Sequence, residues 1–206
     1  MKLQDAMSQE QSTRFPGWLL VGLSVFVVVL LYLIISSLTS RTAPMFDLSP
    51  VGGTPVRVGR TLVDTVTIDA RKSDTWTFFD FERAEVLQLS DTVGWDLAFR
   101  RFNVMSSGEL ADLGAVEFES VATAPLTGYT SPVVGADTVD TAVGRWYRYS
   151  ILSHLLRPTG HVYVLRTGEG AFAKFELVSY YCTGMVAGCV TFRYVYQPQP
   201  GVRDFS

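Results

Sequence analysis

A long apolar segment, from Gly17 to Ser37, interrupts a chain that is otherwise polar at its start. No charged residue occurs between Arg14 and Arg41. About 20 helical residues at about 1.5 Å each match a hydrocarbon core of about 30 Å. A cleaved signal peptide usually has an apolar region of only about 7–15 residues followed by a small-residue cleavage site. The pattern therefore predicts a cytoplasmic tail over 1–16 and a transmembrane helix over 17–38.

Four residues of this segment are candidates for fixing the anchor. Trp18 and Tyr32 lie near its two ends, where amphipathic rings favour the membrane interface. Gly22 and Ser24 are small residues at which another helix could approach, although a serine hydroxyl also bonds back to its own helix. The absence of ionisable side chains in the segment argues against an ion pathway through it.

The stretch after the helix has neither helical nor strand periodicity. Residues 42–60 contain three prolines and three glycines. We therefore expect an extended linker over 39–60. At about 3.3 Å per residue, its residues 42–60 could reach up to about 60 Å.

Strand patterns dominate residues 61–206. Residues 95–100 alternate between apolar and other side chains, which predicts a half-buried strand. We expect long loops over 105–145, with a short strand at Ala115–Phe118. The strand-like runs before and after these loops are Val66–Asp69, Thr75–Phe81, Val86–Leu89, 146–150, 161–166, 171–181 and 189–196. The predicted fold is an all-β domain of antiparallel sheets with a C-terminal meander, in addition to the transmembrane α-helix.

Two cysteines bear on topology. Cys182 and Cys189 bracket a turn between two strand-like runs, which predicts a disulfide and hence an oxidising compartment. Lys2 and Arg14 precede the helix, whereas Arg41 follows it, a small positive-inside bias. We expect a single pass through a bacterial inner membrane, with a cytoplasmic N-terminus and a periplasmic C-terminal domain.

Charge excludes one class of partner. Residues 42–206 include 14 basic and 18 acidic side chains, a net charge of −4. A mildly acidic domain without a Lys/Arg cluster lacks the electrostatic footprint of a nucleic-acid-binding protein.

Several segments of the β-domain resemble the HmuY-like family of bacterial extracytoplasmic proteins. They are GWDLAFRRFNV (94–104), WYRY (146–149), His154 and VYVLRTGEGAFAKFELVSYY (162–181). The resemblance runs from about Asp64 to Gln197. It implies a β-domain of a usually lipid-anchored protein that binds haem and holds the iron through side chains such as a histidine pair. This chain has a transmembrane helix in place of a lipidated cysteine.

Candidate metal ligands are few. His154 and His161 are weak candidates for haem ligation, with Met105 or Met185 as a further soft ligand, and both imidazoles are equally compatible with surface hydrogen bonding. The two cysteines lack the second ligand pair of a zinc site. The favoured expectation is no metal and no cofactor, with haem as the alternative.

Catalytic motifs are absent from the sequence. It contains no G-x-S-x-G, P-loop, H-E-x-x-H or dinucleotide fingerprint. We therefore expect a protein that is not an enzyme.

Two functions are compatible with these features. The favoured interpretation is a non-catalytic accessory subunit, with membrane lipid and other subunits as its partners and with an unknown partner-binding surface. It would scaffold a bacterial membrane complex, for example a photosynthetic reaction centre or a respiratory complex. The alternative is a membrane-anchored haem-binding or haem-transfer protein.

Overall fold

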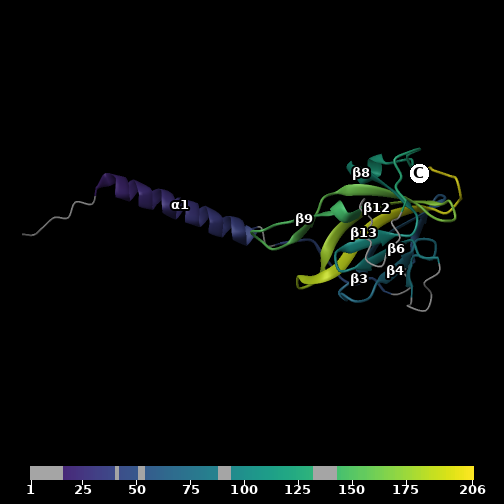
Figure 1. Ribbon diagram of the computed structural model, residues 1–206, viewed down its shortest axis with the longest axis horizontal. Coiled ribbons are helices and arrows are strands. Elements are labelled where there is room, and N and C mark those ends of the chain that lie inside the picture. Colours follow the sequence, from purple (N-terminus) through teal and green to yellow (C-terminus); the bar gives the residue numbers. More distant parts are fainter. Residues whose placement is uncertain (1–15, 40–41, 51–53, 88–93, 132–142) are drawn as a thin grey trace, which may run out of the picture. The chain divides into compact units, whose positions relative to one another are not determined.

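The apolar segment forms the helix α1, Gly17–Thr39 (Figure 1). The computed structural model describes residues 16–39, 42–50, 54–87, 94–131 and 143–206, so the predicted tail lies outside the described residues except for Pro16. The chain divides into two compact units, Met1–Thr42 and Ala43–Ser206. Over 17–38, α1 is long and apolar enough to cross a membrane.

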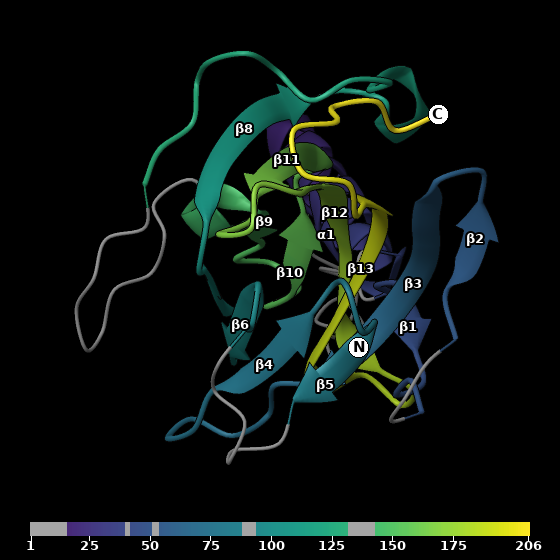
Figure 2. The same ribbon diagram turned by 90° about the vertical axis from the view of Figure 1, so that its right-hand side faces the viewer.

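The second unit is built from β-strands, as the alternation pattern predicts (Figure 2). Its largest sheet has the order β2 (Val56–Val58), β3 (Thr61–Asp69), β13 (Val186–Gln197), β12 (Phe172–Cys182), β11 (His161–Arg166) and β8 (Glu109–Ala115). The short strand β1 (Met45–Phe46) pairs in parallel with the end of β12. All other pairings in this sheet are antiparallel.

Two smaller sheets complete the domain. One has the order β5 (Glu85–Leu87), β4 (Thr77–Asp80), β6 (Leu97–Arg100) and β7 (Asn103–Ser106). The other is a two-stranded hairpin of β9 (Tyr147–Tyr149) and β10 (Leu156–Pro158). Short 3-10 helices lie at Phe118–Ser120 and Val143–Arg145.

Aromatic side chains form the main core between the largest sheet and the four-stranded sheet. Phe99 of β6 stacks on Phe192 of β13 with ring centroids 5.4 Å apart. Phe81, which follows β4, lies 5.0 Å from the ring of Tyr194. These rings are fully buried, so they supply much of the apolar area that the domain removes from water.

A second, smaller core lies on the other face of the largest sheet. It contains Phe118, Phe172 and Phe205, and so joins the segment after β8 and the C-terminal segment to the sheet. Lys174 of β12 is buried here, and its ammonium donates to the carbonyl oxygens of Phe118 at 3.0 Å and Val121 at 2.8 Å. Burial lowers the pKa of Lys174. This lysine therefore ties the 3-10 helix to the sheet.

The structure differs from the sequence-based expectation in three strand assignments. Residues 95–100 do not form a half-buried strand, because Asp96 and Ala98 are buried as well as Leu97 and Phe99. The predicted loop region contains the end of β7 and all of β8. The expected strand at Ala115–Phe118 is not formed, since β8 ends at Ala115 and a 3-10 helix begins at Phe118.

The expected linker over 39–60 is partly inside the sheet. Met45 and Phe46 pair with Tyr181 and Cys182, and β2 pairs with β3. A segment rich in proline and glycine can still form backbone hydrogen bonds to an unpaired strand edge. Such pairing does not require a hydrophobic periodicity in the segment, so the sequence pattern does not reveal it.

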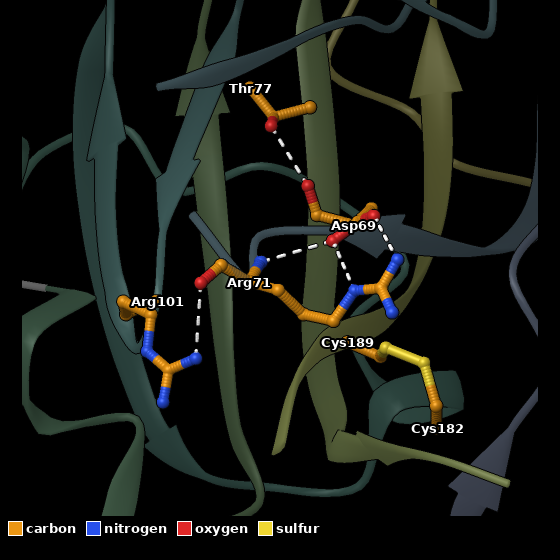
Figure 3. A network of polar contacts seen from close by, with 6 residues as sticks. All are labelled: Asp69, Arg71, Thr77, Arg101, Cys182 and Cys189. Carbon is orange, nitrogen blue, oxygen red and sulfur yellow. Dashed lines mark hydrogen bonds and ion pairs between the residues drawn. A yellow bond between two sulfur atoms is a disulfide. The ribbon is translucent and has the colours of Figure 1, made fainter. Parts of the chain in front are cut away.

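A polar junction holds the end of β3 beside the disulfide hairpin (Figure 3). The Arg71 guanidinium donates to both carboxylate oxygens of Asp69, and this bond lowers the pKa of Asp69. Arg101 donates to the backbone oxygen of Arg71 at 3.1 Å. Cys182 and Cys189 form the predicted disulfide, with Cα atoms 5.2 Å apart.

Asp96 gives the domain a predicted pH dependence. Burial raises its pKa to about 7, and the charges of Asp80, Glu169 and Glu82 add to this, although the Phe81 N–H donates to its carboxylate. The group is protonated in the folded chain and ionised in the unfolded chain between pH 4 and 7. The stability that protonated Asp96 contributes is therefore fully present below about pH 4. It is lost as the pH rises to about 7, which lowers the free energy of unfolding by up to about 4 kcal/mol.

Asp96→Asn is expected to remove this dependence. Urea unfolding of the chain and the variant from pH 4 to 8 should give a difference in the free energy of unfolding that grows with pH, in favour of the variant, and levels off above pH 7. A difference that stays constant with pH would show that Asp96 is ionised in the folded domain.

Candidate functional site

His161 is positioned by the edge of the largest sheet. It is the first residue of β11, and its Nδ1 lies 3.0 Å from both carboxylate oxygens of Asp112 on the neighbouring strand β8. The pairing of β8 with β11 shifts register between His161 and Tyr163, which breaks the regular alternation at this point. Both side chains are 24% exposed. The pair therefore lies at the surface but is partly shielded from water.

The carboxylate determines which imidazole nitrogen is available. An ionised carboxylate only accepts hydrogen bonds, so the Nδ1 of a neutral His161 must carry the proton and donate it to Asp112. The lone pair then resides on Nε2. Metal-bound histidines have this arrangement, in which a carboxylate or carbonyl orients the ring through the other nitrogen.

His154 has a different environment. It lies in the turn between β9 and β10 with a φ of 56°, in the left-handed region. Its Nδ1 lies 2.6 Å from the hydroxyl of Tyr149. Because a phenol hydroxyl can either donate or accept, this contact does not determine which nitrogen carries the proton.

The two histidines do not form a pair. They lie at opposite ends of β10, and each ring bonds to a different partner. Met105 lies on β7, and Met185 lies in the turn between β12 and β13. Within the described ranges, no three His, Cys, Asp or Glu side chains are grouped to hold a metal ion.

Two recesses of the β-domain lie away from both histidines. One, of about 370 Å³, lies between the start of β8 and the turn from β11 to β12. The other, of about 220 Å³, lies between β3 and the β4–β5 turn. Neither His154 nor His161 lines either of these two recesses.

The predicted anchor residues lie on the helix surface. Trp18 and Tyr32 are largely exposed, like most apolar side chains of α1, and their role in anchoring stays a prediction. The Ser24 hydroxyl donates to the Leu20 carbonyl at 2.9 Å, which satisfies it within its own helix. In the described residues, leaving out its two chain neighbours and the backbone of α1, no atom lies within 4 Å of the Cβ that alanine would add at Gly22.

Sequence reasoning missed the two partners of the histidines. Asp112 lies in the region expected to be loops, and its approach to His161 depends on the pairing of β8 with β11. Tyr149 could have been found, because a hairpin over 147–158 brings it close to His154. Lys174 also carried a signal, as it is the one basic residue in the largely apolar strand AFAKFELVSYY.

Solved structures share this β-fold. An apo HmuY analogue of Tannerella forsythia matches with 20% identity and a TM-score of 0.58, covering 69% of this chain and 99% of its own. A protein of Bacteroides vulgatus, assigned as an HmuY-like haem-binding protein, matches with 20% identity and a TM-score of 0.59, covering 73% and 100%. A Bacteroides fragilis lipoprotein matches with 19% identity and a TM-score of 0.58, covering 73% and 97%.

Among curated proteins, no sequence matches this chain. A sequence model described as HmuY protein matches residues 72–194, more than half of the chain. This match corrects the interpretation as an accessory subunit of an energy-transducing complex, and with it the expectation of partner subunits, because the chain matches HmuY proteins, and the similar Bacteroides vulgatus protein is described as haem-binding. The chain belongs to the HmuY family.

Proposed function

We propose that this protein is a membrane-anchored haem-binding protein that acts without catalysing a reaction. Membership of the HmuY family supports haem as the ligand, in place of the favoured expectation of no cofactor. The apolar helix α1 supports anchoring in a membrane. The β-domain would be the part of the protein that holds the haem.

We further propose that the β-domain lies outside the cytoplasm. The bond between Cys182 and Cys189 supports an oxidising compartment. The small excess of basic residues before α1 supports a cytoplasmic N-terminus and hence an inner-membrane, periplasm-facing arrangement.

The observation that carries the haem assignment is the contact between Asp112 and His161. The carboxylate leaves Nε2 of the neutral imidazole with its lone pair, as an iron ligand requires. It also restricts rotation of the ring, so less conformational entropy is lost on ligation. Bound haem would supply an iron that this nitrogen of His161 could ligate.

His154 can be compared with His161 by the group that contacts its Nδ1. It is exposed, but a phenol rather than a carboxylate contacts its Nδ1. A phenol is a weaker acceptor than a carboxylate and therefore raises the basicity of the other nitrogen less. We assign the iron ligand to His161 on this difference.

Haem titration of three variants tests the assignment. The full chain in lipid nanodiscs should develop a Soret band on addition of haem, measured against empty nanodiscs. His161→Ala should abolish the spectrum of the histidine-ligated complex. Asp112→Asn, which keeps the shape of the side chain, should weaken haem binding by about 10- to 100-fold. His154→Ala should leave both the affinity and the spectrum unchanged.

Two outcomes would contradict the assignment. An unchanged spectrum in His161→Ala would remove His161 from the iron. Loss of the spectrum in His154→Ala alone would transfer the role to the hairpin turn. Far-ultraviolet circular dichroism of each variant shows that the sheets remain folded.

A further inference from the structure

The hairpin of β9 and β10 carries aliphatic side chains at its tip. Ile151 is 79% exposed and Leu152 is 68% exposed. Both follow Ser150 in the turn that connects the strands. Single exposed aliphatic residues are common on protein surfaces, but two consecutive ones on a projecting turn form an apolar tip that water solvates poorly.

Arginines flank this tip. Arg148 lies directly opposite Arg157 in the register of the hairpin, and both are exposed. Tyr149, between the arginine and the tip, is 54% exposed. An apolar tip bordered by a tyrosine and by arginines has the composition of a segment at the interface between lipid headgroups and acyl chains.

The turn end of the hairpin, where Leu156 pairs with Tyr149, lies close to the point where the chain enters the β-domain. The Leu156 backbone N–H donates to the hydroxyl of Tyr181 at 2.8 Å. Tyr181 is also the residue that pairs with Met45 of β1. The hairpin and the incoming chain thus meet at the same end of β12.

The connection from α1 to this point is short. Only residues 40–44 separate Thr39, the last residue of α1, from Met45, the first residue of β1. A fully extended connection of this length spans about 20 Å, at about 3.5 Å per residue. A membrane that contains α1 therefore lies within this reach of Met45, and so close to the end of the domain that carries the hairpin.

We propose that the β9–β10 hairpin rests on the surface of the membrane that holds α1. Ile151 and Leu152 enter the interfacial layer, and Arg148 and Arg157 face the phosphates of the lipid headgroups. This contact gives the domain a second attachment, which fixes its orientation relative to the membrane. The inference uses neither His161 nor Asp112, so it stands independently of the haem assignment.

A spin label at the tip tests the contact. Because both native cysteines are in the disulfide, a cysteine introduced by Ile151→Cys is selectively labelled. Leu126→Cys is the matched control, since Leu126 is 80% exposed but lies in the segment between β8 and the second 3-10 helix. The full chain is reconstituted without haem in vesicles of phosphatidylcholine and phosphatidylglycerol. Collisions of each label with oxygen and with a water-soluble nickel chelate are then measured.

The label at position 151 should collide preferentially with oxygen, as in lipid, and the label at 126 with the nickel chelate, as in water. Replacing both arginines by glutamine should shift the label at 151 towards water. Equal, water-like accessibility at the two positions would overturn the proposal. So would spin–spin broadening at 151 that disappears on dilution with unlabelled chain, because the tip would then contact a second copy.

Discussion

Replacing Gly108 by alanine is expected to lower the free energy of unfolding by about 3 kcal/mol or more. Gly108 immediately precedes β8, and a Cβ there would overlap the carbonyl oxygen of Arg166 and lie 3.0 Å from its carbonyl carbon. These are backbone atoms of β11, so a rotamer change cannot relieve the clash. The pairing of Glu109 with Arg166 must open, which also disturbs the strand pair that carries Asp112 and His161.

Gly168→Ala provides the matched control for this prediction. Gly168 lies in the turn after β11, and no atom lies within 4 Å of the Cβ that alanine would add. Its stability should change by less than about 0.5 kcal/mol. Urea unfolding followed by circular dichroism compares the two variants, and equal stabilities would show that the approach of Gly108 to β11 is not rigid.

Replacing Lys174 by methionine is expected to lower the free energy of unfolding by about 3 kcal/mol. The side chain keeps a similar length, but the carbonyl oxygens of Phe118 and Val121 lose the charged donor that lies 3.0 and 2.8 Å away. The ammonium also lies 4.6 Å from the centroid of the Phe118 ring, a favourable contact that methionine replaces only in part.

Hydrogen exchange locates the effect of this change. Exchange in Lys174→Met should accelerate most in residues 118–121, which the lysine holds against β12. Lys72→Met is the control, because Lys72 is exposed and methionine there should change neither stability nor exchange. Uniform acceleration across both sheets would mean that the lysine supports the whole domain and not this segment in particular.

Sequence patterns predicted most of the fold. The strands that these patterns missed have a physical explanation. Strands with strong alternation or dense apolar side chains, such as β11, β12 and β13, were found within a residue or so, except that β13 begins at Val186 rather than at Cys189. β8 was missed because its sequence, ELADLGA, mixes acidic residues, alanine and glycine. Its position on the sheet depends on pairing with β11, a contact that no local propensity contains.

The candidate site was predictable only in part. The histidines could be named because the chain has only two. What distinguishes His161 is Asp112, which lies far from it in sequence and reaches it only across the β8–β11 pair. The accessory-subunit interpretation was wrong because it weighed the missing motifs more heavily than the WDLAF strand and the AKF hairpin, the segments that mark the family.

Haem titration of the unmodified full chain in nanodiscs measures directly whether this protein binds haem. We expect a saturable Soret band at one haem per chain, with a spectrum of histidine ligation that persists when empty nanodiscs are added in excess. Haem that redistributes to the empty nanodiscs in proportion to their lipid, without a protein-specific spectrum, would contradict it.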